Sequence, residues 1–381
     1  MLVTADAGPA TSVGHLWLAD FRCLCEIDVE LASGLTVLQG ANGQGKTSLL
    51  EAIGWVARAR SFRGVTDAML VRSGATEAIV RAEVTTSGRQ QLFEAEIRAT
   101  GRNRILCNRQ AVTRARDLHG LLRVTVFAPD DLTLVKGGPA ERRDFVDELL
   151  AMLAARYDVA RSDFERVLKQ RNALLRSGVR EEEARFTLDV FDEQLVLAGA
   201  ELTRGRLRLL DRLVPAVATA YETLALDMRP IIATYMSESS SVPLTAADAD
   251  TLEDQLRDAL ARRRRAEIDR GLTLVGPHRD ELHLMIDGLD ARYQASQGEQ
   301  RTLALALRLA GHVVVRELTG AAPVLLLDDV FSELDAQRAA ALVHNLPPGQ
   351  TLLTTAGALP PDVVAQQNLV VRAGRIEAVS P

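Results

Sequence analysis

The chain has 381 residues, which is enough for two or three domains of ordinary size or for one body with a large insertion. Hydrophobic residues make up 47% and charged residues 25%, as in average globular proteins, and this excludes a wholly disordered chain. The formal net charge of -6 gives no chain-wide attraction to nucleic acid, so any DNA contact must come from a local basic surface. No apolar run reaches the roughly 20 residues of a membrane span, and an odd count of 3 cysteines favours reduced thiols, so we expect a soluble, cytoplasmic protein.

The first residues are small and polar, without the basic and apolar regions of a signal peptide. They predict a flexible N-terminal tail over residues 1–14. Residues 15–40 then contain three short runs of strand type, L-W-L-A-D-F-R, E-I-D-V-E-L and L-T-V-L-Q-G. We interpret them as three strands of a meander that opens the fold.

A glycine-rich loop follows the third strand and opens a helix over residues 47–59, whose apolar side chains share one face. Residues 40–47 read G-A-N-G-Q-G-K-T and satisfy G-x-x-x-x-G-K-[ST]. In this setting backbone N–H groups cradle phosphates, Lys46 reaches the β and γ oxygens of ATP, and Thr47 ligates Mg²⁺. The predicted ATP-binding residues of this loop are Gly40, Ala41, Asn42, Gly43, Gln44, Gly45, Lys46, Thr47 and Ser48.

Strand-like alternation returns in residues 78–98 and 104–112, and a short apolar strand is predicted over 124–128. Helical periodicity follows, and after a charged turn near residues 178–184 four leucines recur every seven positions. These are Leu188, Leu195, Leu202 and Leu209. Heptad spacing also fits a dimer zipper, but two helices joined by a short turn more simply pack on each other. We interpret this segment as a helical hairpin that forms an arm or second lobe.

The C-terminal half returns to strands after a loop at residues 237–250 and a charged helix at 252–270. Strands are predicted over residues 272–275, 282–286, 324–327, 351–355 and 369–371. The whole pattern indicates an α/β fold, a P-loop sheet with antiparallel strands that is split by a helical insertion. The predicted division is a tail at 1–14, the first part of an ATPase head at 15–140, a helical lobe at 141–270 and the second part of the head at 271–381.

The apolar run of residues 324–327 ends in two carboxylates, Asp328 and Asp329, as expected of a buried strand with acidic residues at its C-terminal edge. This pattern indicates a Walker B motif. Asp328 would hold Mg²⁺ through water, and Asp329 would orient the attacking water as a catalytic residue beside Lys46.

The segment Ser296–Gln300, S-Q-G-E-Q, precedes an apolar helix over residues 301–318 and resembles the signature motif of ABC ATPases. Alone, so short a motif more often caps a helix. Here it lies 32 residues before Asp328 (328 minus 296), and S-E-L-D at residues 332–335 follows like a D-loop. The resemblance implies that the serine and glycine contact the γ-phosphate of ATP held by a second subunit. It adds the following ATP-binding residues: Ser296, Gln297, Gly298, Glu299 and Asp335.

Longer motifs resemble the RecF family of bacterial recombination and repair ATPases, over most of residues 15–375. They include L-W-L-A-D-F-R (16–22), A-R-S-F-R (59–63), F-A-P-D-D-L-T-L-V-K-G-G-P-A-E-R-R (127–143), L-V-G-P-H-R-D-E-L (274–282) and L-L-L-D-D-V-F-S-E-L-D (325–335). The resemblance implies an ATP-induced, head-to-tail homodimer that binds single-stranded, duplex and gapped DNA. It also implies slow hydrolysis that resets the clamp, work with RecR, RecA loading in gap repair, and SOS induction.

Three positions depart from the usual ABC pattern. No Q-loop glutamine is evident in residues 127–132, and Thr354 or Thr355 stands where a switch histidine is usual. Asp329 fits the RecF pattern but is one methylene shorter than the usual ABC glutamate, and we hypothesise that it holds the attacking water less well. The G-P-H-R-D segment of residues 276–280 is interpreted as a structural or nucleotide-proximal loop rather than a catalytic His/Asp site.

Candidate DNA contacts are arginines in three regions of the chain. They are Arg60, Arg63, Arg102, Arg104, Arg109, Arg262, Arg263, Arg264 and Arg265. Basic runs on helices are usually solvated faces, and carboxylates at 267 and 269 lie close to the last run. Aromatic residues are only 4%, so we expect contact with the DNA backbone rather than base stacking.

Three other functions use similar motifs. A transporter ATPase would need a membrane partner, an aromatic A-loop and a switch histidine. An SMC-like linker would need a far longer coiled coil than the 250 positions from Lys46 to Ser296 (296 minus 46) allow. A metal-dependent nuclease with an ABC head would need a His/Asp cluster outside Walker B. The RecF-like function fits the sequence best.

Overall fold

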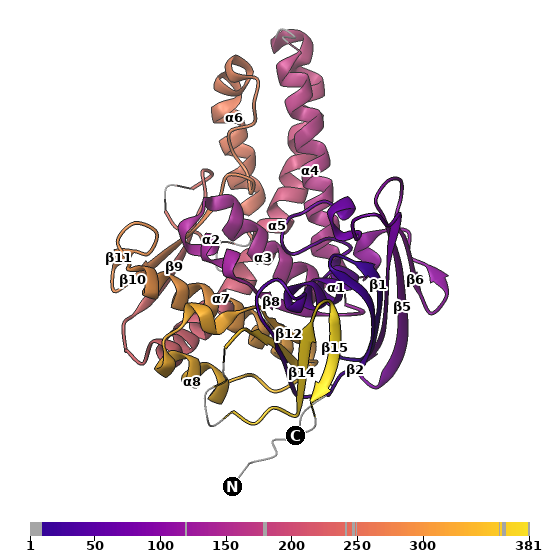
Figure 1. Ribbon diagram of the computed structural model, residues 1–381. Coiled ribbons are helices and arrows are strands. Elements are labelled where there is room, and N and C mark those ends of the chain that lie inside the picture. Colours follow the sequence, from indigo (N-terminus) through magenta and orange to yellow (C-terminus); the bar gives the residue numbers. More distant parts are fainter. Residues whose placement is uncertain are drawn as a thin grey trace. The chain divides into compact units, whose positions relative to one another are not determined.

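The computed structural model describes residues 10–118, 120–177, 181–240, 242–245, 248, 250–357, 359 and 363–379 (Figure 1). The chain divides into two compact units. The first unit comprises Met1–Asp131, Thr219–Met228 and Arg301–Pro381, and the second comprises Leu132–Ala218 and Arg229–Gln300. The division predicted from the sequence, in which the head resumes at residue 271, stays a proposal.

An antiparallel sheet of the first unit has the strand order β2-β1-β4-β5-β6-β7. Its strands are β1 (Ser12–Phe21), β2 (Leu24–Glu30), β4 (Glu77–Thr86), β5 (Arg89–Arg98), β6 (Arg104–Cys107) and β7 (Gln110–Ala111). Alternation decides which side faces the core: Val80 and Ala82 are buried, whereas Arg81 between them is exposed. Because β1 already begins at Ser12, residues 12–14 of the predicted tail belong to a strand; residues 1–9 lie outside the described residues.

A second sheet of the first unit has the order β15-β14-β3-β13-β12-β8 and is parallel except for β15. Its strands are β3 (Leu35–Gln39), β8 (Val124–Phe127), β12 (Val324–Leu327), β13 (Thr351–Thr355), β14 (Gln367–Arg372) and β15 (Arg375–Val379). Helix α1 (Lys46–Arg58) packs on strands of both sheets and buries Trp55 completely. The predicted meander is therefore wrong in its third member, since β3 joins the parallel sheet rather than β1 and β2.

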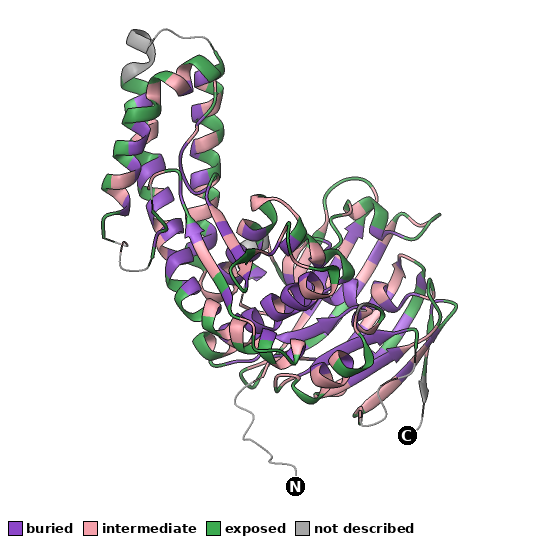
Figure 2. Cartoon of the chain, turned by 90° about the vertical axis from the view of Figure 1, so that its left-hand side faces the viewer, coloured by how far each residue is buried: buried purple, intermediate pink, exposed green. Residues whose placement is uncertain are grey.

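Three helices form the core of the second unit. They are α4 (Ala155–Arg176), α5 (Glu181–Ala225, which enters the first unit at Thr219) and α6 (Leu252–Arg270). Phe164 of α4, Leu195 of α5 and Leu260 of α6 belong to one buried cluster, and the buried faces turn inward (Figure 2). All four heptad leucines are buried within the chain, at most 2% exposed, which supports the hairpin over the dimer zipper. The charged turn predicted at 178–184 lies outside the described residues at 178–180, and Glu181 already opens α5.

The second unit also contains short elements around a small sheet of order β11-β10-β9. These are α2 (Thr133–Lys136), α3 (Pro139–Leu153), β9 (Ile231–Met236), β10 (Glu281–Ile286) and β11 (Leu289–Asp290). The strand β9 was not predicted, and the strand predicted over 272–275 is wrong, because those residues form turns and irregular backbone. Helix α7 (Gln297–Thr319) begins in the second unit, and α8 (Ala336–His344) lies in the first. Short 3₁₀ turns occupy Asp67–Leu70, Ala115–Leu118, Pro129–Leu132 and Val330–Glu333. Within the described residues, no helix is long and apolar enough to cross a membrane.

Candidate nucleotide-binding site

The glycine-rich loop connects β3 to α1 and is shaped by backbone that only glycine tolerates well. Gly45 has φ +110, and a Cβ there would lie 2.6 Å from a methyl carbon of Leu24. The Lys46 ammonium turns back over the loop and donates to the carbonyl oxygens of Gly40 at 2.5 Å and Ala41 at 3.0 Å. The loop thus places a cation and the first N–H groups of α1 at one point, the arrangement that binds polyphosphate.

Asp328 at the end of β12 lies against the start of α1. Its Oδ1 accepts hydrogen bonds from the hydroxyls of Thr47 and Thr354, both at 2.8 Å. Burial raises the pKa of this carboxyl above its ordinary value, and the two hydroxyls oppose that rise. Thr47 and Asp328 are hard oxygen ligands held side by side, which fits the predicted Mg²⁺ site.

Asp329 adopts the left-handed conformation, φ 48 and ψ 33, at the sharp turn after β12. Its backbone N–H donates to the Thr354 hydroxyl at 2.8 Å. Thr354 therefore contacts both Walker B aspartates, one through each side of its hydroxyl. The sequence had offered Thr354 or Thr355 only as the residue in place of a switch histidine; Thr355 instead contacts the backbone of Gly357.

A cavity of about 390 Å³ joins these groups within the first unit. It is lined by Cys23, Asn42, Gly43, Gly45, Lys46, Thr47, Ser48, Arg63, Ala128, Pro129, Asp130, Asp328, Asp329 and Thr354. The lining combines the glycine-rich loop, the candidate magnesium ligands Thr47 and Asp328, and the candidate water-orienting carboxylate of Asp329. Its residues fit MgATP, which when bound would supply the phosphoryl group and the charge-neutralising cation.

Arg63 was predicted as a DNA contact, but its side chain lines this cavity, and its charge opposes the rise that burial causes in the pKa of Asp328. A chain of buried and part-buried contacts holds its segment. Arg22 forms a bidentate ion pair with Glu51 of α1, both N···O distances being 2.9 Å, and the Ser61 hydroxyl donates to the same carboxylate. The N–H of Arg63 in turn donates to Ser61 Oγ at 3.0 Å. The D-F-R and A-R-S-F-R motifs thus meet at Glu51 and position Arg63.

The Q-loop position is occupied by Ala128, Pro129 and Asp130, all of which line the cavity. Asp131 holds this turn: its Oδ2 accepts from the N–H of Ala128 at 2.8 Å, and its Oδ1 accepts from Arg308 of α7. Asp130 is thus an acidic residue of the cavity lining, in the segment where the sequence shows no Q-loop glutamine.

The signature segment lies in the second unit, where it begins α7 with a capping box. The Ser296 hydroxyl accepts from the N–H of Glu299 at 3.3 Å, and the Glu299 carboxylate accepts from the N–H of Ser296 at 2.6 Å. Arg229 forms an ion pair with Glu299, and the Gln300 amide donates to the carbonyls of Ala291 and Arg292. These contacts fix the helix start that presents Ser296, Gln297 and Gly298.

Two other predicted ATP-binding residues have structural roles in this chain. Gln44 accepts a hydrogen bond from the N–H of Ala373 and so ties the loop to the β14–β15 turn. Asp335 caps α8 by accepting from the N–H of Arg338. Neither is among the described residues that line the cavity.

The strand arginines predicted for DNA are exposed on the β5–β6–β7 edge. Arg104 pairs in register with Glu96, which is also bonded to Arg98, so carboxylates already surround this part of the sheet. Arg102 and Arg109 are exposed in the adjoining turns, and Arg60 is exposed after α1. Arg264 is half-buried and ion-paired with Asp189 and Asp192 of α5, whereas Arg262, Arg263 and Arg265 are exposed.

His278 of the G-P-H-R-D loop lies in the second unit beside Phe164. Its Nε2 is 3.3 Å from the carbonyl oxygen of Thr273, and burial lowers its pKa to about 4. Asp280 is also buried, and its carboxylate accepts a hydrogen bond from the Tyr235 hydroxyl at 2.7 Å. These bonds agree with a structural role for the loop.

Comparisons with known proteins agree with this geometry. The family described as RecF/RecN/SMC N terminal domain matches residues 12–353. DNA replication and repair proteins RecF of Streptomyces avermitilis and Frankia alni are each 46% identical; the alignments cover 96% and 95% of this chain and 100% and 98% of those proteins.

Solved structures give the same result. A solved structure of the recombination mediator protein RecF with ATP, in the RecFOR pathway, has a TM-score of 0.89 at 27% identity, covering 98% of this chain and 99% of that one. An Smc head domain from Pyrococcus furiosus, with 15% identity, a TM-score of 0.59 and coverage of 97% and 96%, shows the shared fold alone. From its P-loop to its Walker B strand, and over nearly its whole length, the chain belongs to the RecF family of DNA replication and repair proteins.

Proposed function

We propose that this protein is an ATP-dependent DNA-binding clamp for replication and recombinational gap repair. In this proposal ATP closes two copies head to tail, and slow hydrolysis reopens them. The observation that carries the proposal is the cavity in which the P-loop, Asp328, Asp329 and Thr354 converge. The similarity to RecF–ATP structures supports ATP as the ligand.

The residues divide the work of an ATP switch. Lys46 and the α1 N-terminus would bind the phosphates, Thr47 and Asp328 would hold Mg²⁺, and Asp329 would orient the attacking water. Ser296 and Gly298 begin a helix in the second unit and are not among the described residues of the cavity. In the proposed dimer they contact ATP bound by the other copy.

The partners proposed are those of the family named by the relatives. We propose that the dimer binds single-stranded, duplex and gapped DNA, acts with RecR, and so supports RecA loading and SOS induction. The similar solved structures are of RecF in the RecFOR pathway, and this supports the RecR partnership. Cytoplasmic location stays a prediction from the sequence.

The test is light scattering of the protein with and without ATP and Mg²⁺, followed by titration onto gapped duplex. Asp329→Asn should block turnover and accumulate ATP-dependent dimers with raised DNA affinity. Lys46→Met should abolish ATP binding, and Ser296→Arg should spare ATP binding while it prevents closure. Dimers that show no DNA response would remove the repair role, and a monomer under all conditions would refute the shared-site switch.

Slow hydrolysis has its own test. Asp329→Glu restores the longer carboxylate usual in ABC ATPases, and we expect faster single-turnover hydrolysis because the water is held more closely. An unchanged rate would show that the length of this side chain does not limit the reaction.

A further inference from the structure

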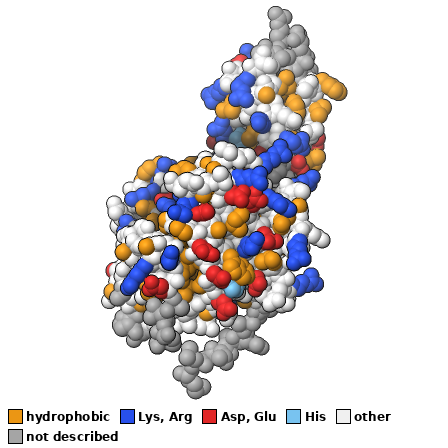
Figure 3. Space-filling model, turned by 45° about the vertical axis from the view of Figure 1, so that its right-hand side comes forward, with side chains coloured by type: hydrophobic (Ala, Val, Ile, Leu, Met, Phe, Trp, Pro, Cys, Tyr) orange, Lys and Arg blue, Asp and Glu red, His pale blue; other side chains and the backbone are white. Residues whose placement is uncertain are grey.

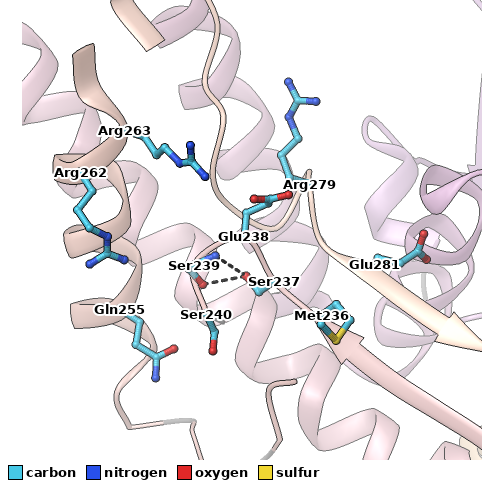
Figure 4. A pocket seen from close by; sticks show the side chains of 10 residues that line it. All are labelled: Met236, Ser237, Glu238, Ser239, Ser240, Gln255, Arg262, Arg263, Arg279 and Glu281. Atoms are coloured by element: carbon cyan, nitrogen blue, oxygen red, sulfur yellow. Dashed lines mark hydrogen bonds between the residues drawn. The ribbon is translucent and has the colours of Figure 1, made fainter. Parts of the chain in front are cut away.

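A second large cavity, of about 740 Å³, lies entirely within the second unit and is hereafter called the arginine cavity. It is lined by Met236, Ser237, Glu238, Ser239, Ser240, Gln255, Arg262, Arg263, Arg279 and Glu281. Arg262 and Arg263 project from α6, and Arg279 projects from the loop on the opposite side, with Glu238 and the serines between them (Figure 4). Three cationic side chains from two separate segments therefore border one hollow.

The charges of these arginines are not neutralised within the described part of the chain. No described carboxylate lies within 4.0 Å of the guanidinium groups of Arg262, Arg263 or Arg279, and all three side chains are exposed. The contrast within α6 is sharp, because Arg257 pairs with Glu193 and Asp254, and Arg264 pairs likewise with two aspartates. In helix α6, therefore, Arg257 and Arg264 form ion pairs within the protein, whereas the guanidinium groups of Arg262 and Arg263 are available to a ligand.

The remaining walls are polar and add little negative charge. Ser237 Oγ lies 2.8 Å from Ser239 Oγ and accepts from the N–H of Ser239, so the turn carries hydroxyl groups toward the cavity (Figure 4). Glu281 is already bonded to Arg142 through both carboxylate oxygens, at 2.8 and 2.9 Å. Glu238 is the one lining carboxylate without such an ion pair among the described residues.

A buried network holds the loop that carries Arg279. Arg206 forms a bidentate ion pair with Asp147, at 2.7 and 2.8 Å, and also donates to the carbonyl of Pro277 and to the Tyr235 hydroxyl. Tyr235 donates to Asp280, next to Arg279. Because this network is buried, the position of the Arg279 backbone is set before any ligand arrives.

We propose that the arginine cavity binds the phosphodiester backbone of DNA. The inference rests on the proposed function, which it deepens by naming where a strand contacts the second unit. Guanidinium forks match pairs of phosphate oxygens, and the serine hydroxyls supply further donors. The described lining contains no aromatic ring, so contact is with the backbone and carries no base stacking. Lys and Arg side chains also gather over the helices of this unit on the face drawn in Figure 3.

The test measures binding of labelled single-stranded, duplex and gapped DNA by fluorescence anisotropy over a range of salt concentrations, with ATP and Mg²⁺. The triple variant Arg262→Gln/Arg263→Gln/Arg279→Gln should reduce the slope of log K against log salt. Each lost phosphate contact removes roughly 0.7 from the slope on single strands and roughly 0.9 on duplex. Loss of all three contacts therefore lowers the slope by about 2.1 on a single strand and by about 2.7 on duplex. The DNA form whose measured loss comes closer to its own full value is the form that occupies the cavity.

Two further variants make the result specific. Arg270→Gln removes an exposed arginine of the same helix that does not line the cavity, and it should leave the slope unchanged. Glu238→Gln removes the unpaired carboxylate and should tighten DNA binding at least twofold, the opposite direction from the triple variant. ATP binding, measured separately, should stay at the wild-type value in all of them, because Lys46 lies in the first unit.

The outcomes separate the two proposals. If wild-type protein with ATP binds no DNA form, the proposed function fails and this inference with it. If wild-type protein binds DNA and the triple variant keeps the full salt slope, the function stands and the arginine cavity is not its DNA site. A triple variant that keeps the DNA slope but loses binding to a polyglutamate peptide would assign the cavity to an acidic protein segment instead.

Discussion

Thr354 is the residue whose role the sequence least revealed, because β13 carries three threonines and no pattern marks which of them faces the site. Its hydroxyl joins Asp328 Oδ1 to the Asp329 N–H, residues 26 and 25 positions away in the chain. Only the parallel pairing of β12 with β13 brings them together. Thr354 is therefore a positioning residue for the Asp328 carboxylate and for the backbone of Asp329.

Thr354→Val keeps the side-chain shape and removes both hydrogen bonds. We expect single-turnover ATP hydrolysis to fall roughly 10- to 100-fold, as for other outer-shell partners of a metal site. Thr354→Ser should restore the rate. Thr355→Val is the matched control, because Thr355 is also buried on the same strand, but among the described residues its hydroxyl bonds only to the backbone of Gly357. Equal losses in the two valine variants would reduce Thr354 to a packing residue.

His312 of α7 is 1% exposed, and neither ring nitrogen has a hydrogen-bond partner among the described residues. Burial lowers its pKa to about 3, from an ordinary value of 6.5. The unfolded chain therefore binds a proton at a pH where the folded chain does not. The contribution of neutral His312 to the unfolding free energy is fully present above pH 6.5 and is lost as the pH falls from 6.5 toward about 3.

His312→Leu should flatten this dependence by up to about 1.4 kcal/mol of unfolding free energy per pH unit within that range. The measurement is urea unfolding of variant and wild type at several pH values from 4 to 8. His344→Gln, at an exposed position of α8, should show the wild-type dependence. Parallel curves for His312→Leu and wild type would contradict the assignment.

Arg171 shows how the three helices of the second unit are joined. It is fully buried on α4 and pairs with Asp192 of α5 and Glu267 of α6, both at 2.7 Å, and it donates to Thr273 at 2.8 Å. A buried ion pair contributes little over apolar packing, but removal of one partner leaves charge uncompensated in the core. Arg171 thus links the three helices, and its replacement without a compensating change at its acidic partners should destabilise them.

Arg171→Met should destabilise the second unit by about 3–5 kcal/mol, because Glu267 remains buried without its cation. Chemical denaturation followed by circular dichroism measures the change. Arg166→Met on the same helix is the control: its pair with Asp163 is exposed and should contribute under about 1 kcal/mol. Similar losses in both variants would mean that the buried triad has no special role.

The sequence predicted single helices and strands better than it predicted which of them pack together. The P-loop between β3 and α1, the buried strand β12 and the helix α6 carry strong local patterns, and all three are confirmed. The order of the parallel sheet and the packing of α6 on the α4–α5 hairpin depend on contacts between distant segments. Arg63 illustrates the same limit at the site: its motif was evident, but only the bonds through Ser61 and Glu51 direct it to the cavity.

On the scale of the whole molecule, the nucleotide cavity and the tryptophans that can report on it lie in the same unit. The chain has 2 tryptophans, Trp17 and Trp55, and both lie in the first unit with the nucleotide cavity. Tryptophan fluorescence should therefore follow the unfolding of the unit that binds ATP. The variant Ser296→Arg, which by the proposed mechanism cannot close the dimer, is used to keep dimerisation out of the measurement.

In that background, ATP with Mg²⁺ at 100 times its dissociation constant should raise the unfolding free energy reported by tryptophan by about 2.7 kcal/mol. Addition of Lys46→Met should abolish the gain. A gain that persists without Lys46 would place the nucleotide somewhere other than the P-loop cavity.

The strand order of the parallel sheet has a consequence for folding of the protein during its synthesis. The P-loop strand β3 has β13 and β14 as its neighbours, and both are encoded after residue 350. A ribosome that has reached residue 300 has produced the complete second unit, but it has produced no strand that flanks β3. The P-loop is therefore present in the nascent chain for most of translation before the strands that flank β3 have been made. A product released before residue 351 keeps the motif, but cannot shape a nucleotide pocket.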